Sequence, residues 1–223
     1  MVRVVSFNCY TLPKAATEVV QLDPDIVFFQ EAPSRKHVRQ VAEDLFGNEA
    51  DFLWSPDTSI VARGTLREIV SGRSSHFVLA ELTTRDAANM HVASLRLSPP
   101  SFRADFWSLG CWSDHSAVRA EHRQQILNVL QAVDELPAST PLIVGGDFNS
   151  VPDDAALRPL EPRLADTFRA AGRGWGNTGT NSYPLWRVDQ IWASDQFDVR
   201  QTFAQTSIRS DHRMVVCDLI LRD

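Results

Sequence analysis

The chain has 223 residues, of which 43% are hydrophobic and 22% are charged. This ordinary composition excludes a collagen, a coiled coil and a disordered chain. Acidic residues outnumber basic ones by 28 to 22, and the formal net charge of −6 argues against a generally basic nucleic-acid-binding protein, although a local basic groove is compatible with it.

Segments rich in β-branched and aromatic residues recur along the chain and predict strands. In chain order they cover residues 2–8, 25–30, 59–63, 75–82, 90–97, 141–145, 188–193 and 214–221. Several are apolar almost without interruption, as at residues 26–29, whereas a strand with one face in water would alternate. The pattern therefore indicates sheets that are covered on both faces.

Fewer segments have helical spacing. One predicted helix runs from Ser34, a candidate N-cap, to Gly47, which can terminate it. A second covers about residues 114–136, and we expect a short one after Pro152. Helices placed irregularly among strands do not fit the strict alternation of a doubly wound or barrel fold. We therefore expect an α+β protein in which two sheets pack face to face with helices outside.

Neither a repeat, a low-complexity tract nor a Gly/Ser-rich linker divides the sequence, so we expect a single domain over residues 1–223. The three cysteines are far apart and lack a CxxC pair, which indicates buried thiols in a reducing compartment. The amino terminus lacks a long apolar stretch, and the apolar runs are too short for a bilayer. We therefore expect a cytoplasmic protein without a signal peptide.

Polar residues stand at the ends of the predicted strands, where side chains from distant segments can converge. They are Asn8, Glu31, Asp147, Asn149, Asp189, Asp211 and His212. Each has a simpler explanation when taken singly. A strand-end glutamate is usually solvated or caps a helix, and Asp and Asn favour turns because their side chains bond their own backbone. Their common position at strand ends makes one shared site plausible.

The order of these residues resembles that of the endonuclease/exonuclease/phosphatase superfamily, which includes DNase I, AP endonucleases, neutral sphingomyelinases and inositol-polyphosphate 5-phosphatases. Five segments carry the resemblance: residues 6–8 (SFN), 25–31 (DIVFFQE), 145–149 (GGDFN), 187–191 (RVDQI) and 210–212 (SDH). They follow the order of the family and span almost the whole chain. The resemblance implies a four-layer αββα sandwich of two mixed β-sheets flanked by helices, which agrees with the pattern of the elements.

By this resemblance, Glu31 is the principal ligand of a divalent cation, with Asn8 and Asp211 beside it. Oxygen ligands with few carboxylates suit Mg²⁺ or Mn²⁺, which also bind the phosphate of a substrate. The implied cofactor is therefore Mg²⁺ or Mn²⁺.

The same resemblance implies roles for four further residues. Asp147 orients and deprotonates the attacking water, and Asn149 holds the nucleophile or a phosphate oxygen. His212 acts as a cationic hydrogen-bond donor beside the scissile phosphate, with the Asp189 carboxylate as its partner. These roles describe in-line attack by water without a covalent intermediate.

The chain departs from the family at Arg96, where many members carry a histidine in a strand that ends with a His-Leu pair. An arginine can still clamp a phosphate through two parallel hydrogen bonds. The alternative is that Arg96 pairs with a nearby acid and does not touch the substrate. Asn181, in a turn-rich loop before residue 186, is a second candidate for a substrate contact, and a plain surface connection is the alternative there.

Residues 99–112 have no clear period and contain aromatic side chains beside Arg103. These aromatics either stack on bases or an apolar part of the substrate, or anchor a loop onto the body of the protein. We favour the anchored loop.

The sequence thus predicts a metal-dependent phosphoester hydrolase, most consistent with a phosphodiesterase or nuclease whose substrate is a nucleic acid or nucleotide. A small phosphorylated metabolite or a lipid headgroup is the alternative substrate, because the acidic net charge and the two lysines of the chain disfavour nucleic acid. A catalytically inactive binding module with the same fold is the alternative from another class. We expect no membrane span, and no protein partner can be inferred.

Overall fold

The computed structural model describes residues 1–70, 76–85, 88–101 and 103–222. The strands are β1 (Val2–Asn8), β2 (Ile26–Gln30), β3 (Ala50–Leu53), β4 (Thr58–Arg63), β5 (Thr65–Val70), β6 (Phe77–Thr83), β7 (Asn89–Arg96), β8 (Leu142–Asp147), β9 (Ala165–Asp166), β10 (Asp189–Ala193), β11 (Phe197–Gln205) and β12 (Met214–Leu221). Over these described ranges, they form two six-stranded sheets with the orders β11-β12-β1-β2-β4-β3 and β5-β6-β7-β8-β10-β9. Both sheets are mixed, because β1 runs parallel to β2 and β7 runs parallel to β8.

The central core lies between the two sheets. Ile26 and Phe28 of β2 pack there with Val92 of β7 and Ile143 of β8, and all four side chains are at most 1% exposed. The alternate residues of β2 point the other way, toward helices, so this strand is buried on both faces. The prediction that continuous apolar runs form strands covered on both faces is confirmed here.

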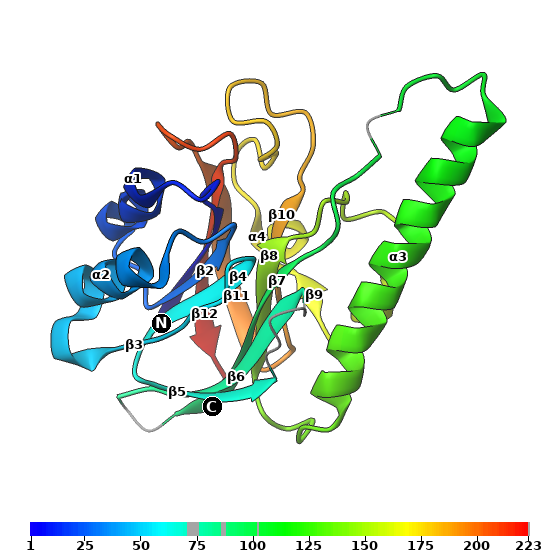
Figure 1. Cartoon of the computed structure of the whole chain (residues 1–223). Helices are drawn as coiled ribbons and strands as arrows, with labels where there is room; N and C mark the ends of the chain where they lie inside the picture. Colours follow the sequence, from blue (N-terminus) through cyan, green and yellow to red (C-terminus); the bar gives the residue numbers. More distant parts are fainter. Residues whose placement is uncertain (71–75, 86–87, 102, 223) are drawn as a thin grey trace.

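Helices form the outer two layers of the molecule (Figure 1). On the first sheet these are α1 (Pro13–Ala16), the 3-10 turn η1 (Thr17–Leu22) and α2 (Arg35–Phe46), which is followed by η2 (Gly47–Glu49). On the second sheet they are α3 (Leu109–Asp134) and η3 (Arg158–Leu160), while α4 (Thr167–Ala171) lies against β10 and β11. The predicted four-layer sandwich is confirmed.

The predicted helices agree with the structure to different degrees. Helix α2 begins after Ser34 and ends at Phe46, directly before Gly47, whose positive φ of 54° favours glycine. Helix α3 begins at Leu109, earlier than the predicted residue 114, and ends at Asp134. The short helix expected after Pro152 is only the 3-10 turn η3. No helix of the described residues is both long and apolar enough to cross a membrane.

The prediction that the aromatic side chains of residues 99–112 anchor a loop is wrong for the described residues. Phe106 is 55% exposed, Trp107 is 88% exposed and Trp112 is 58% exposed. Figure 1 shows that the loop and the first turns of α3 extend beyond the sheets. Arg103 pairs with Asp105 and Asp114 instead of an aromatic ring. Phe102 lies outside the described residues.

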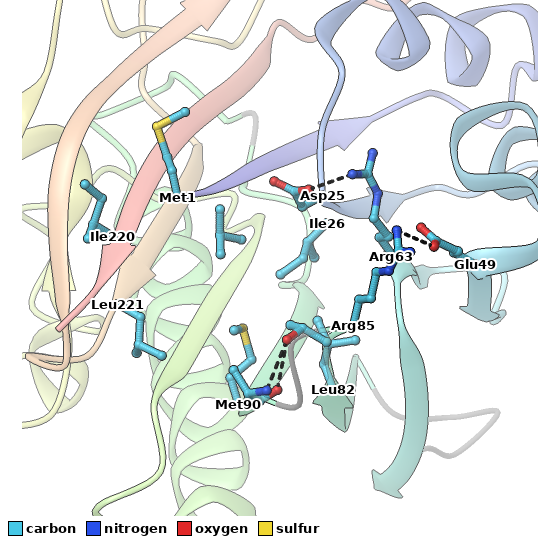
Figure 2. A pocket seen from close by; sticks show the side chains of 13 residues that line it. Met1, Asp25, Ile26, Glu49, Arg63, Leu82, Arg85, Met90, Ile220 and Leu221 are labelled. Carbon is cyan, nitrogen blue, oxygen red and sulfur yellow. Dashed lines mark hydrogen bonds and ion pairs between the residues drawn. The ribbon is translucent and has the colours of Figure 1, made fainter. Parts of the chain in front are cut away.

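The strand directions bring the carboxyl ends of β1, β2, β7 and β8 to one edge of the sandwich, where β10 and β12 begin. The opposite edge carries a pocket of about 400 Å³ between the sheets. Its floor includes Leu82 and Met90, and its rim carries Arg63, which lies 3.7 Å from Asp25 (Figure 2). The polar strand-end residues of the sequence therefore gather at the edge away from this pocket.

Candidate active site

Three polar residues lie side by side on neighbouring strands of the second sheet. The register of β7 and β8 pairs Arg96 with Asp147, and the register of β8 and β10 pairs Asp147 with Asp189. Residues that are paired in this way point to the same face of a sheet. The first sheet lies opposite, where Asn8 ends β1 and Glu31 follows β2.

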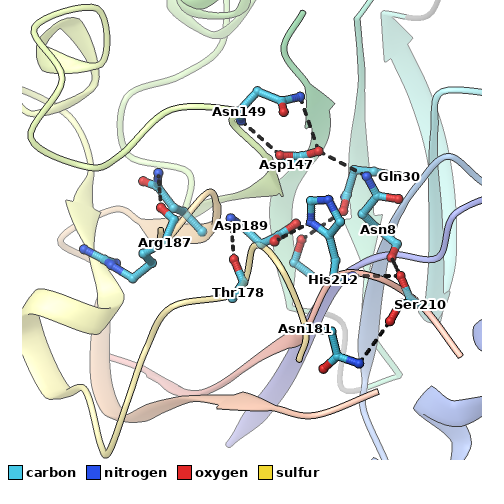
Figure 3. A network of polar contacts seen from close by, with 12 residues as sticks. Asn8, Gln30, Asp147, Asn149, Thr178, Asn181, Arg187, Asp189, Ser210 and His212 are labelled. Atoms are coloured by element: carbon cyan, nitrogen blue, oxygen red, sulfur yellow. Dashed lines mark hydrogen bonds and ion pairs between the residues drawn. The ribbon is translucent and has the colours of Figure 1, made fainter. Parts of the chain in front are cut away.

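The side chain of Asn8 links the two sheets (Figure 3). Its Nδ2 donates to Asp147 Oδ2 at 3.1 Å and to Glu31 Oε1 at 3.2 Å, and its Oδ1 accepts from the backbone N of Tyr10 at 3.1 Å. Asn8 is 1% exposed, so water does not compete for these bonds. One buried amide therefore fixes the spacing between two carboxylates that come from different sheets.

Glu31 and Arg96 form an ion pair at the same edge. Arg96 Nη2 lies 2.7 Å from Glu31 Oε1, and Arg96 Nη1 lies 3.6 Å from Asp57 Oδ1. Glu31 has a backbone φ of 46°, a conformation that residues other than glycine rarely adopt. The guanidinium therefore neutralises part of the negative charge at the position where the sequence predicts a metal ligand.

Asp147 is 1% exposed and accepts several hydrogen bonds. The backbone N of Asn149 lies 3.0 Å from Asp147 Oδ1, and Asn149 Nδ2 lies 3.3 Å from Asp147 Oδ2. Burial raises the pKa of Asp147 to about 6, and the charge of Asp189 acts in the same direction while His212 opposes it. A carboxyl with this pKa exchanges a proton close to neutral pH.

His212 and Asp189 form a buried pair beside Asp147. His212 Nδ1 lies 2.8 Å from Asp189 Oδ2, and the Asp189 side chain is 0% exposed. Burial acts to lower the pKa of His212, but the charges of Asp189 and Asp147 outweigh it and raise the pKa to about 10. The ring is therefore a cation at neutral pH. Since Nδ1 is held by Asp189, Nε2 is the donor that remains for another group.

The site contains oxygen ligands of the kind that a hard divalent cation prefers. Ligand atoms of Asp147, Asp189 and His212 all lie within 4.8 Å of one another. Asp189 Oδ1 is buried and has no hydrogen-bond partner among the described residues. Asp189 Oδ2 is bonded to His212, but a buried carboxylate oxygen without a donor, such as Oδ1, is costly unless a cation or a proton satisfies it. Because the His212 ring is a cation with no free lone pair, the carboxylates of Asp147, Asp189 and Glu31 and the Asn8 amide oxygen are the groups that fit a bound metal ion.

Asp211 and Asn181 lie in loops around this group. Asp211 is exposed, and its backbone carbonyl accepts from the backbone N of Asn181 at 2.5 Å. Asn181 Nδ2 donates to the carbonyls of Ser207 and Ser210, at 2.6 and 3.0 Å. Among the described residues, neither side chain forms a hydrogen bond with Glu31. The proposed ligand role of Asp211 and the substrate contact of Asn181 therefore stay predictions.

Two residues hold the site although the sequence predicts no role for their side chains: Ser210, which belongs to the 210–212 segment, and Thr178. Ser210 Oγ donates to the carbonyl of Asn8 at 2.7 Å and accepts from the backbone N of His212 at 3.1 Å. Thr178 Oγ1 accepts from the backbone N of Asp189 at 3.0 Å. Both are buried hydroxyls that bond to the backbone of site segments, and the bond from Ser210 to Asn8 joins segments 202 residues apart. The only sequence signal for them is their position beside the site motifs.

Comparison with known proteins gives the family of the chain. The sequence model of the Endonuclease/Exonuclease/phosphatase family matches residues 5–212. A similar sequence is the uncharacterized protein YbhP of Escherichia coli (strain K12), which is 26% identical over 202 residues, covering 83% of this chain and 78% of that protein. The span of residues 5–212 that the family model matches includes every site residue described above.

Solved structures share the fold. The mannosyl-6-phosphatase Bt3783 of Bacteroides thetaiotaomicron is similar with a TM-score of 0.73 at 17% identity, over 99% of this chain and 100% of that chain. A humanized TDP2 of D. rerio carrying 14 mutations is similar with a TM-score of 0.71 at 16% identity, over 98% of both chains. Because the family model spans nearly the whole chain and the fold agrees, the protein belongs to the endonuclease/exonuclease/phosphatase family.

Proposed function

We propose that the protein is a divalent-metal-dependent phosphoester hydrolase that cleaves a phosphodiester by in-line attack of water. The observation that carries this proposal is the buried Asp189–His212 pair, which lies against Asp147 at the edge where both sheets end. A histidine held as a cation supplies a hydrogen-bond donor for the charge that develops on phosphoryl oxygens. Members of the family hydrolyse phosphoesters, which agrees with this chemistry.

Asp147 is proposed as the group that orients the attacking water and accepts its proton. Its raised pKa supports this role, because a general base is most effective when its pKa lies near the working pH. Asn149 is proposed to hold the nucleophile or a phosphate oxygen, since its Nδ2 lies beside the Asp147 carboxylate. Water that attacks directly opposite the leaving group inverts the configuration at phosphorus.

Glu31, Asn8 and Asp211 are proposed to hold Mg²⁺ or Mn²⁺. A bound divalent ion would polarise a phosphoryl oxygen of the substrate. Carboxylate and amide oxygens are the donors that these hard cations prefer. The three cysteines are free and buried, which supports the further proposal of a reducing, cytoplasmic setting.

Exposed aromatic side chains near the site favour a nucleic acid or nucleotide as substrate. Tyr10, which follows Asn8, is 53% exposed, and Tyr183 and Trp186, in the loop before β10, are 80% and 55% exposed. The backbone of Trp186 pairs with Gly179, which itself bridges to His212. Aromatic faces at this position can stack on bases, an interaction that depends little on sequence.

A small phosphorylated molecule is the second candidate substrate. The structural similarity to a mannosyl-6-phosphatase and the net charge of −6 favour it. A lipid headgroup presents the same phosphate chemistry and belongs to this alternative. An inactive binding module is less well supported, because binding alone has no evident need for a buried imidazolium pair beside a carboxylate of raised pKa.

The proposal predicts metal-dependent turnover that requires Asp147. Product release would be measured from a chromogenic phosphodiester, its monoester, single-stranded DNA and RNA, and duplex DNA with an abasic site, each with Mg²⁺, with Mn²⁺ and with EDTA. Asp147→Asn should reduce turnover by about 10³-fold or more, because it removes the proposed general base while keeping a side chain of the same shape. Asp198→Asn is the matched control, since it makes the same chemical change at an exposed residue of β11 that pairs with Arg222.

The outcomes separate the candidates. Cleavage of DNA or RNA that weakens steeply as salt rises supports a nuclease. Cleavage of the monoester alone supports the small-molecule alternative. Turnover that persists equally in Asp147→Asn, or a chiral phosphorothioate product with retained configuration, contradicts the proposed mechanism.

A further inference from the structure

The contact between Arg96 and Glu31 places a fixed positive charge on the expected metal ligand. The two side chains come from opposite sheets, since Arg96 ends β7 and Glu31 follows β2. Their side chains are only 24% and 21% exposed, and the Nη2–Oε1 distance is 2.7 Å. Removing one partner of a pair that is mostly shielded from water is costly, because the other charge is then left without compensation.

The oxygen that Arg96 contacts has no free lone pair for a metal ion. Glu31 Oε1 accepts from both Arg96 Nη2 and Asn8 Nδ2. A carboxylate oxygen has two lone pairs, so a metal ion that binds there must displace one of these donors. A divalent ion and a guanidinium also repel each other at this distance. Metal binding and the Arg96–Glu31 contact therefore exclude each other at Oε1, and a metal ion at Oε2 of the same carboxylate would still be repelled by the guanidinium.

A second carboxylate and a depression lie beside the Arg96 guanidinium, so the side chain can leave Glu31. Its Nη1 already lies 3.6 Å from the exposed carboxylate of Asp57, and its Nε is buried without a partner among the described residues. A depression of about 170 Å³, lined in part by Asp57, Arg96 and Ser98, lies beside the guanidinium. An unused Nε–H next to Nη–H groups can bind a phosphate through two parallel hydrogen bonds.

We propose that Arg96 is an internal counter-ion for Glu31 which a metal ion must displace, and that the freed guanidinium then binds the incoming phosphate group. The proposal rests on the metal-ligand role of Glu31 in the proposed function. Its consequence is that the metal and a phosphate ester bind cooperatively, because each favours the state in which Arg96 has left Glu31. Such coupling is reciprocal, so the phosphate ester tightens metal binding by the same factor.

The first test is the affinity of the metal-free protein for Mn²⁺, measured by calorimetry without any substrate. Arg96→Met keeps an unbranched apolar stem and removes the guanidinium with its charge and its donors. We expect Arg96→Met to bind Mn²⁺ about tenfold more tightly, because the competing cation is gone. Arg67→Met is the matched control: it changes the net charge equally and breaks an exposed pair with Glu81 on β6, so its affinity should match the wild type.

The second test repeats the titration in the presence of dimethyl phosphate. In the wild type this diester should tighten Mn²⁺ binding, and in Arg96→Met the tightening should be lost. Arg96→Lys retains a positive charge without the planar fork of donors. It should therefore bind Mn²⁺ as weakly as the wild type and show a smaller effect of dimethyl phosphate.

Thermal unfolding supplies a readout that does not depend on binding curves. Without metal, Arg96→Met leaves Glu31 largely buried without its cation, and we expect the melting temperature to fall by about 3–5 °C. With saturating Mn²⁺ the difference from the wild type should disappear, because the metal ion then neutralises Glu31 in both proteins.

Each outcome decides the inference independently of turnover. Equal Mn²⁺ affinities of Arg96→Met and the wild type would overturn it, even if the protein hydrolyses phosphoesters. Unchanged Mn²⁺ binding in Glu31→Gln would also overturn it, since the metal ion would then bind elsewhere. Tighter binding in Arg96→Met together with loss of the dimethyl phosphate effect supports it, even if every substrate of the panel fails.

Discussion

At the scale of single residues, the charge of His212 depends on one neighbouring carboxylate. Asp189 Oδ2 holds the Nδ1 edge of the ring at 2.8 Å, and the carboxylate is fully buried. A buried imidazole without such a partner favours its neutral form. Replacing the Asp189 carboxylate by an amide of the same shape should therefore lower the pKa of His212 from its value of about 10.

We expect Asp189→Asn to reduce turnover at neutral pH by about 100-fold or more, because the ring loses the proton that it presents to the phosphate. NMR titration of the imidazole in the metal-free variant checks the cause, and the His212 pKa should lie well below 10. Asp198→Asn should leave both the titration and the turnover unchanged. A ring that still titrates near its original value in Asp189→Asn contradicts this account of its charge.

At the scale of the elements, an ion pair joins β1, which carries Asn8, to β12. Arg3 and Asp218 are opposite each other in the antiparallel register, with Arg3 Nε 2.7 Å from Asp218 Oδ1 and Arg3 Nη2 3.0 Å from Asp218 Oδ2. The Asp218 side chain is 4% exposed. The hydrogen bond from Arg3 lowers the pKa of Asp218 below its usual value.

We expect Arg3→Met to reduce the free energy of unfolding at neutral pH by about 1–3 kcal/mol, because a buried carboxylate loses its partner. A lowered pKa in the folded state means that the stabilisation is complete above the ordinary aspartate pKa of about 4 and is lost as the pH falls through the lowered value. Urea unfolding should therefore show the two proteins converging in acid. Arg222→Met, which breaks the exposed pair with Asp198, should change the stability by less than about 0.5 kcal/mol at every pH.

The elements that the sequence predicts best are those buried on both faces. Strands β2 and β12 have continuous apolar runs, and their predicted and observed bounds differ by at most one residue. Strands β5 and β11 were missed because they lie at sheet edges, where exposed positions carry residues such as Arg67 and Asp198 and local composition resembles a loop. The start of α3 was missed because its first apolar residue, Leu109, is 88% exposed and gives no periodic signal.

At the scale of the whole molecule, the two sheets approach so closely that a side chain is excluded at Gly145. A Cβ atom there would lie 2.3 Å from Cδ2 of Phe28, which belongs to the other sheet and is 0% exposed. The ring cannot retreat, because it is packed on all sides by the central core. The short distance between the two sheets therefore requires a glycine at position 145 of β8.

We expect Gly145→Ala to reduce the free energy of unfolding by about 1–3 kcal/mol through overpacking. Combining it with Phe28→Leu should cost less than the sum of the two single changes, because the smaller side chain makes room for the methyl group. Strict additivity in urea unfolding would contradict the contact between the sheets at this position.

The same closeness of the layers limits what the sequence reveals about the site. Asn8, Glu31, Asp147 and Asp189 could be expected near one another because each stands at a strand end, and the structure brings them together. The contact of Arg96 with Glu31 could not be expected in the same way, since it depends on how two sheets face each other across the core. Local sequence patterns carry no information about that distance.

The hydrogen bond between Asn8 and Asp147 crosses the space between the layers. Neither sheet alone carries a complete set of the proposed groups: one supplies Asn8 and Glu31, and the other supplies Asp147 and Asp189. A nascent or partly unfolded chain with only one layer formed would therefore lack the complete proposed site. The proposed activity therefore requires that both halves of the sandwich have formed and packed together, whichever of them folds first.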